Sequence, residues 1–227
     1  MAPESAPESA PESAPDGVTT PMFPLQSALL PGETLPLRIF EPRYSRLVAD
    51  CLDAPEPAFG VVLISRGREV GGGDVRSDVG AMARITQFAD HGEGQYELLA
   101  SITGRLRVSQ WLPDDPYPRA RVQPWPDEPG PEVTSERVGD VVDAITALYQ
   151  RVAEASGGQL RPDALAVDAD IADDPSLHIY ALASRVPMGQ ADRYAVLAAP
   201  TLAARVDTLL DAIETVTAMV HFQLTDE

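Results

Sequence analysis

The stretch PLRIFEPRY, residues Pro36–Tyr44, decides how the chain begins to fold. Leu35, Leu37, Ile39 and Phe40 form an apolar run typical of a strand, and this run breaks directly into Glu41-Pro42-Arg43. The segment that follows, PRYSRLVADCL, places apolar side chains on one side at helical spacing: Tyr44, Leu47, Val48, Cys51 and Leu52. The sequence therefore predicts a strand, a sharp corner and a short helix.

The surrounding residues, 20–126, have the pattern of many short strands. FGVVLI at 59–64 is rich in β-branched residues, and VGAMARITQFA and GQYELLASITGRLRVSQWL alternate apolar with polar positions, the latter with an expected bend at Gly104. Glycine and proline clusters at 71–73, 90–94 and 113–116 supply turns between them. This combination favours a β-barrel or a β-sandwich.

The pattern changes after a linker at 127–136. Residues 137–227 contain long runs with apolar positions at a period near 3.6, in ERVGDVVDAITALYQRVAEA and again in TLAARVDTLLDAIETVTAMVHF. Two shorter helices, SLHIYALASRV and QADRYAVLAA, lie between them, and Asp174-Pro175-Ser176 is a plausible start for the first. The prediction is an α+β protein with a β-rich half followed by an α-helical half.

Charge and composition exclude several classes of protein. The 227 residues carry a formal net charge of −18, and all 17 basic residues are arginine. Without lysine there is no Walker phosphate loop, no lysine Schiff base and no Ser-Lys dyad. Residues 127–227 hold 18 acids and 6 arginines, which makes nucleic acid a poor partner.

The remaining composition points to a cytoplasmic protein. Cys51 is the single cysteine, no apolar run approaches the ~20 residues that span a bilayer, and no secretion signal begins the sequence. Residues 1–19, dominated by the repeat APESAPESAPESAPD, are expected to be a disordered acidic leader because they lack an apolar face.

No catalytic motif, metal site or cofactor site emerges from the sequence. The three histidines, His91, His178 and His221, are far apart, and the acidic run at 168–174 lacks the glycine and closing glutamate of a calcium loop, so a solvated loop is expected there. Cys51 falls on the apolar side of its helix, where a free thiol behaves as a small hydrophobe. No G-x-S-x-G elbow occurs.

The corner and its surroundings resemble a known family. MFPLQSALLPGETLPLRIFEPRYSRLVADCL is similar to the opening of the amino-terminal, substrate-binding domain of Lon proteases. Later landmarks of that family follow in order from Pro21 to Leu210: Phe59-Gly60-Val61-Val62, Val79-Gly80 with Ala83 and Ile85, Gly104 with Arg107, Tyr117-Pro118 with Ala120 and Val122, and the helical segment DPSLHIYALASRVPMGQADRYAVLAAPTLAARVDTLL with Leu197 and Arg205. Val108 departs from the phenylalanine that the family prefers.

The resemblance implies a PUA-like β-barrel followed by a helical bundle, and a role in recognising polypeptides. It also implies a stand-alone domain, because the ATPase and protease modules of Lon are expected to be absent from this chain. The expected partner is an unfolded or specific polypeptide, with no cofactor, no nucleic acid and no membrane, and the oligomeric state is left open.

Two roles compete for the quoted corner. In the first, Glu41, Pro42 and Arg43, together with Gly104 and Arg107, are structural. Glu41 and Arg43 then pair with each other, with Arg107, or with backbone groups. In the second, three nearby side chains border a groove that receives an apolar peptide segment: Arg38, Phe40 and Tyr44. A catalytic role has no nucleophile or base to support it.

Three functions follow as hypotheses. The first is a non-enzymatic polypeptide-binding module, an adaptor or a binder of unfolded or damaged proteins. The second is an enzyme with a site at the junction of barrel and bundle, supplied by Tyr96, His178, Tyr180 and scattered acids. The third is RNA binding by analogy with other PUA-like barrels, which the net charge disfavours.

Overall fold

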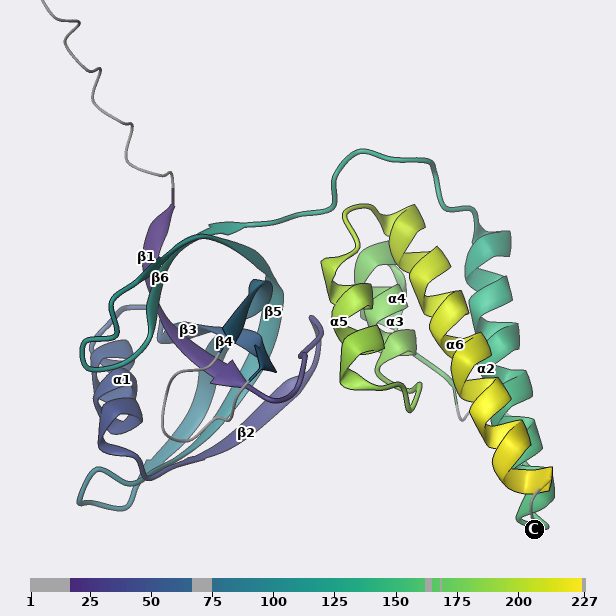
Figure 1. Cartoon of the computed structure of the whole chain (residues 1–227), viewed down its shortest axis with the longest axis horizontal. Helices are drawn as coiled ribbons and strands as arrows, with labels where there is room; N and C mark the ends of the chain where they lie inside the picture. The colour runs from purple at the N-terminus through teal and green to yellow at the C-terminus, as the bar shows by residue number, and fades with distance from the viewer. Residues whose placement is uncertain (1–16, 67–74, 162–164, 168, 226–227) are drawn as a thin grey trace, which may run out of the picture.

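The computed structural model describes residues 17–66, 75–161, 165–167 and 169–225 and shows a β-barrel beside a helical bundle (Figure 1). The barrel contains β1 (Val18–Leu25), β2 (Thr34–Ile39), α1 (Pro42–Leu52), β3 (Ala58–Arg66), β4 (Val75–Asp90), β5 (Tyr96–Leu112) and β6 (Arg119–Pro124). The bundle contains α2 (Ser135–Ala155), α3 (Ala169–Ala172), α4 (Pro175–Ala183), α5 (Gln190–Ala198) and α6 (Leu202–Thr225). The α+β prediction is confirmed.

The sheet closes on itself because one strand is long enough to pair three times. The strand order is β2-β5-β4-β3-β1-β6, with a further pairing between β5 and β6. The first part of β5 pairs with β2, its last part pairs with β6, and β4 runs along most of its length. β5 is continuous through Gly104, where its register with β4 shifts: Met82 pairs with Gly104 and Ala83 with Ile102, which leaves Thr103 as an extra residue. Such a bulge is the usual cause of a local bend in a strand.

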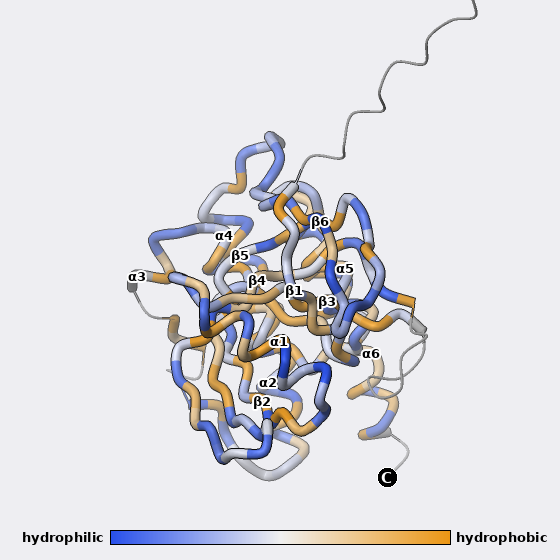
Figure 2. Tube along the Cα trace, turned by 90° about the vertical axis from the view of Figure 1, so that its left-hand side faces the viewer, coloured by the Kyte–Doolittle hydropathy of each residue, from blue (hydrophilic) through white to orange (hydrophobic). Residues whose placement is uncertain are grey.

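The barrel contains two clusters of buried apolar residues, and neighbouring strand residues such as Met22 and Phe23 belong to different clusters. In the first, α1 packs against the strands, with Tyr44, Leu47, Val48 and Cys51 buried as the helical spacing predicts. Pro42 occupies the first turn, where its missing N–H costs no helical hydrogen bond. The other cluster, which we call the mouth cluster, consists of Met22, Val62, Leu106, Val108, Ala120 and Val122. Figure 2 shows apolar residues along the strands, with hydrophilic residues frequent in the peripheral loops.

The bundle is built on capped amphipathic helices. Thr134 caps α2 by accepting a hydrogen bond from the backbone N–H of Arg137. Asp174 caps α4 by accepting from the N–H groups of Ser176 and Leu177, which confirms the predicted helix start. Helices α2 and α6 pack along each other, and the bundle core extends to barrel residues Leu30, Val79 and Trp125, so the two halves share apolar contacts.

The structure corrects two of the sequence-based expectations. Val18 and Thr19, assigned to the leader, are strand residues because they pair with Val122 and Arg121 of β6. The acidic run at 168–174 contains the short helix α3 rather than only a loop, and Ile171 within it is partly buried. The rest of the leader and the glycines at 71–73 lie outside the described residues. In the described part of the chain, no helix combines the length and apolarity that crossing a bilayer requires.

Candidate functional site

The corner quoted at the outset is held by its own ion pair. Arg43 Nε donates to Glu41 Oε2 at 3.2 Å, and both side chains are largely buried. The Arg43 guanidinium also lies 4.5 Å from the ring centroid of Tyr44. Of the three pairings considered from the sequence, the structure shows the one between Glu41 and Arg43.

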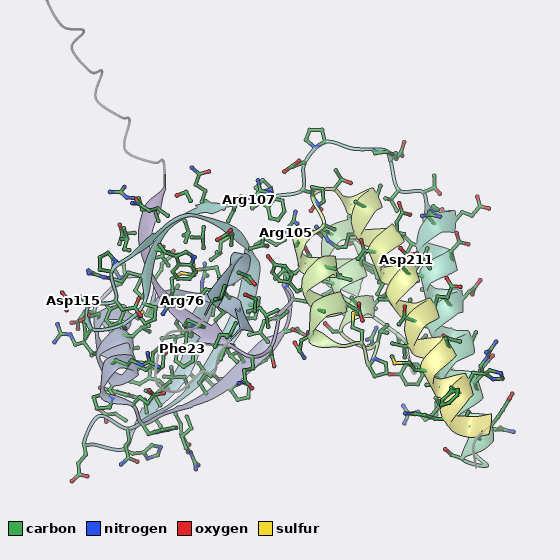
Figure 3. The ribbon with its side chains drawn as sticks, viewed as in Figure 1. Phe23, Arg76, Arg105, Arg107, Asp115 and Asp211 are labelled. Atoms are coloured by element: carbon green, nitrogen blue, oxygen red, sulfur yellow. The ribbon has the colours of Figure 1, made fainter. Side chains whose placement is uncertain are left out.

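Gly104 and Arg107 belong to a different place. Both lie on β5, where Arg107 stacks over the Trp125 ring at 3.9 Å and approaches Glu128 at 4.0 Å. Figure 3 shows Arg105 and Arg107 on the side of the barrel that faces the bundle. The predicted structural set therefore separates into a corner beside α1 and a pair of residues near the junction.

The residues predicted to contact peptide differ in exposure. Phe40 is 66% exposed, and Arg38 is an exposed side chain whose guanidinium binds Glu97 at 2.8 Å. Tyr44 is 4% exposed and its ring stacks on Phe23 with centroids 4.1 Å apart. Tyr44 therefore belongs to the barrel core, while Arg38 and Phe40 remain available on the surface.

A hollow of about 390 Å³ is lined by residues of β1, β4, β5 and β6, and we call it the barrel mouth. Its lining is mostly apolar because inward-facing strand residues of the mouth cluster reach its floor. The lining residues are Val18, Thr20, Met82, Thr103, Gly104, Arg105, Leu106, Val122 and Pro124. Open barrel mouths are common places for ligands.

A second hollow, the junction cleft, lies between barrel and bundle. It has a volume of about 260 Å³ and is lined by Pro31, Trp125, Pro126, Asp127, Asp174, Ser176, Leu177 and Tyr180, together with Thr103, Gly104 and Arg105. The last three residues line both hollows. A Cβ placed on Gly104 would meet nothing within 4 Å, so there is open space at this shared residue.

A buried ion cluster forms one wall of the junction cleft. Arg105 donates to the carbonyls of Leu197 and Ala199 at 3.0 and 2.5 Å and to Asp127 Oδ1 at 2.6 Å. Arg205, fully buried on α6, binds both oxygens of Asp127 and donates to Ser176 Oγ at 2.8 Å. One carboxylate thus connects β5, α4 and α6.

The opposite charges of this cluster stabilise one another and hold Arg105, Asp127 and Arg205 in their ionised forms. Burial tends to raise the pKa of Asp127, but the Arg205 hydrogen bond and the charges of Arg205 and Arg105 hold that pKa below its usual range. Burial lowers the pKa of Arg105 and raises that of Tyr180 to about 12. Tyr180 stacks against Arg205, whose Cζ is 4.1 Å from the ring centroid.

Such a cluster holds charge but offers no proton-transfer group poised near neutral pH. A guanidinium does not act as a base in proteins, and a tyrosine with a raised pKa remains protonated. The other residues suggested for a junction enzyme do not all gather there: Tyr96 packs against the core cluster beside α1, whereas His178 and Tyr180 lie on α4. Among the described residues, no three of His, Cys, Asp and Glu are placed to hold a metal ion.

From the sequence, Gly104 was expected to be structural, Val122 and Arg205 were only family landmarks, and Arg105 and Asp127 were not predicted as site residues. Arg205 carries the one signal that was available, since it lies within a helix whose neighbours Leu202, Val206 and Leu209 are apolar. Its partners Arg105 and Asp127 are 100 and 78 positions away in the sequence, and no local pattern joins them.

Comparison with known proteins gives the family. A model described as the ATP-dependent protease La (LON) substrate-binding domain matches residues 19–215. This chain belongs to the Lon substrate-binding domain family. Among full-length relatives, it is 29% identical over 204 residues to Lon protease 2 of Sorangium cellulosum, and 26% identical over 195 residues to the Lon protease of Roseiflexus castenholzii. Each match covers 86% of this chain and 24% of the relative, so the Lon-type domain spans about a quarter of their length.

Solved structures agree with this assignment. A Lon N-terminal domain protein from Xanthomonas campestris has a TM-score of 0.60 and 27% identity, with 86% of this chain and 98% of that chain covered. The N-terminal domain of the Mycobacterium avium complex Lon protease has a TM-score of 0.56 and 16% identity, with 87% and 98% covered, which supports the fold. The sequence resemblance to Lon is confirmed.

Proposed function

We propose that this Lon-type domain is a non-enzymatic module that binds polypeptide segments at the barrel mouth and the adjoining junction cleft. One observation carries the proposal: a mostly apolar hollow on the barrel shares Thr103, Gly104 and Arg105 with a more polar cleft between barrel and bundle. The family's description as a substrate-binding domain supports the same role. An adaptor, or a binder of unfolded proteins, is the form of activity that this surface suits.

The chemistry of the hollow supports binding without catalysis. Apolar side chains dominate the mouth, and burying apolar area contributes about 25 cal/mol per Å² without needing a reactive group. The charged groups of the cleft wall are already engaged by one another and by backbone carbonyls. Because the main attraction is apolar, affinity should change little with salt.

Arg38 and Phe40, at the end of β2, form a second candidate surface. Phe40 presents an exposed aromatic ring, and Arg38, which pairs with Glu97, lies two residues before it in the sequence. Isolated exposed apolar residues are common on protein surfaces, so this patch is the weaker proposal. Its contribution is tested by replacing Phe40 with serine.

A matched pair of glycine substitutions tests the proposal. Gly104→Leu should place a bulky side chain in the space at the residue that lines both mouth and cleft. Gly139→Leu on α2 is the control, because it adds the same side chain at another glycine whose Cβ would meet nothing within 4 Å. Binding of a fluorescently labelled, permanently unfolded apolar polypeptide is measured by anisotropy. We expect Gly104→Leu to weaken binding by about tenfold, a difference of about 1.4 kcal/mol, while Gly139→Leu leaves it unchanged.

Thermal unfolding curves of both variants provide the folding control. Retained affinity in Gly104→Leu, with a loss in Phe40→Ser, would move the site to the surface beside α1. Absence of binding by the native protein across several unfolded polypeptides would contradict the function itself.

A further inference from the structure

We propose that the two adjoining hollows select polypeptide segments in which an apolar residue is next to a basic one. This inference rests on the proposed function and names its substrate class. The apolar side chain would enter the barrel mouth, and the lysine or arginine would extend over the junction cleft. Two features of the described residues carry it: the apolar lining of the mouth and the sign of the charges that a ligand can reach in the cleft.

The side chains that a ligand can contact in the barrel mouth are mostly apolar. Its floor is formed by Leu106 and Val122, both buried in the mouth cluster, with Met82 packed against them. Val18 at its edge is 70% exposed, so apolar surface is available to a ligand. Thr20 and Thr103 are the neutral polar members of the lining, and Arg105 is its charged member. A short aliphatic or aromatic side chain therefore suits this hollow.

The cleft presents its carboxylates more openly than its cations. The side chains of Arg105 and Arg205 are 3% and 0% exposed, while that of Asp127 is 25% exposed. Asp174 is an exposed residue at the start of α4 and also lines the cleft. A ligand in the cleft consequently contacts acidic oxygens, and the guanidinium groups lie behind them.

Three further observations fit a ligand that carries hydrogen-bond donors and a positive charge. The hydroxyl of Tyr180, a residue 2% exposed that lines the cleft, has no hydrogen-bond partner among the described residues. At the rim, Arg107 and Glu128 approach each other at 4.0 Å, so each offsets the other's charge. Residues 127–227 as a whole carry 18 acids against 6 arginines, which attracts a basic segment over longer distances.

The shared residues set the spacing of the two side chains. Thr103, Gly104 and Arg105 line both hollows, so the apolar and basic groups of a ligand lie on either side of one residue of β5. Neighbouring residues in an extended peptide are about 3.3 Å apart along the chain, which allows adjacent or next-but-one positions to reach the two hollows.

The test uses three labelled dodecapeptides with the same Leu-Val-Phe centre. Two arginines, two glutamines or two glutamates flank this centre, and binding to the full chain is measured at 50 and 300 mM NaCl. Asp174→Asn removes one accessible charge while keeping the side-chain oxygen that caps α4. Asp211→Asn is the matched control, because Asp211 is exposed on α6 and lines neither hollow (Figure 3).

We expect the arginine peptide to bind about tenfold more tightly than the glutamate peptide at 50 mM NaCl, with a smaller ratio at 300 mM. Asp174→Asn should weaken the arginine peptide about threefold and leave the glutamine peptide unchanged, whereas Asp211→Asn should affect neither. Equal binding of all three peptides, sensitive to Gly104→Leu, would overturn this inference and leave the proposed function standing. Equal effects of Asp174→Asn and Asp211→Asn would also overturn it, and a lack of binding by every peptide would overturn both proposals.

Discussion

Arg205 is the residue whose replacement should damage the fold most clearly. It is fully buried on α6, binds both oxygens of Asp127 and donates to Ser176 Oγ. In Arg205→Met the aliphatic volume is largely kept, but Asp127 loses one of its two cationic partners and Ser176 loses a donor. Breaking a buried charge pair by removing one partner costs about 3–5 kcal/mol. Since single domains are stable by about 5–15 kcal/mol, this is a large fraction of the total.

The matched control is another arginine–aspartate pair. Arg137 binds Asp207 between α2 and α6, but the two side chains are 44% and 64% exposed, so Arg137→Met should cost less than about 1 kcal/mol. Urea unfolding followed by circular dichroism gives both values, and the slope with urea shows whether each transition remains two-state. A loss in Arg205→Met no larger than that in Arg137→Met would refute the view that the ion cluster fastens the barrel to the bundle.

Three further predictions follow from the same structure. The pKa of Asp127 is held below its usual range in the folded protein, so the stabilisation that its carboxylate provides is present above about pH 4 and is lost as pH falls through the folded pKa. The difference in unfolding free energy between wild type and Asp127→Asn should therefore shrink in acid. A constant difference from pH 7 to pH 3 would contradict this. Burial, with a smaller effect of Asp50, raises the pKa of Cys51 to about 12. A disulfide reagent at pH 8 should therefore label this thiol at least about 100-fold more slowly in the native protein than in 6 M guanidinium. Rapid labelling of the native protein would show that α1 does not cover the thiol. Tyr180→Phe removes a buried hydroxyl without a partner and keeps the ring against Arg205, so the variant should gain about 1 kcal/mol in thermal or urea unfolding; a loss of that size would mean that the hydroxyl is hydrogen-bonded.

Local patterns predicted the elements because each pattern has a local physical cause. The helix Pro42–Leu52 was expected with these limits, since proline fixes its first turn and the apolar spacing marks its buried side. The start of α4 was likewise predicted from Asp174, whose carboxylate caps the helix. Periodicity alone leaves a barrel and a sandwich as alternatives for the β-rich half. The family resemblance selected a barrel followed by a helical bundle.

The candidate site depended on contacts that sequence patterns do not record. Tyr44 was expected at a peptide groove, yet its position on the buried side of α1 places it against Phe23 in the barrel core. Gly104 was expected at a bend in its strand; the register of β5 with β4 does shift at this residue, but sequence patterns do not record that Gly104 lines two hollows. Arg105 and Asp127 meet Arg205 only after barrel and bundle have docked.

Polypeptide docking at the barrel mouth is most directly observed through methyl groups. Met82, Leu106 and Val122 line the mouth, whereas Met219 and Leu224 are exposed near the end of α6 and serve as internal references. Methyl-labelled protein is titrated with an unfolded apolar polypeptide and followed by heteronuclear NMR. If polypeptides dock there, we expect saturable shifts at Met82, Leu106 and Val122 with little change at Met219 and Leu224. Shifts confined to the end of α6, or to the surface around Phe40, would contradict it.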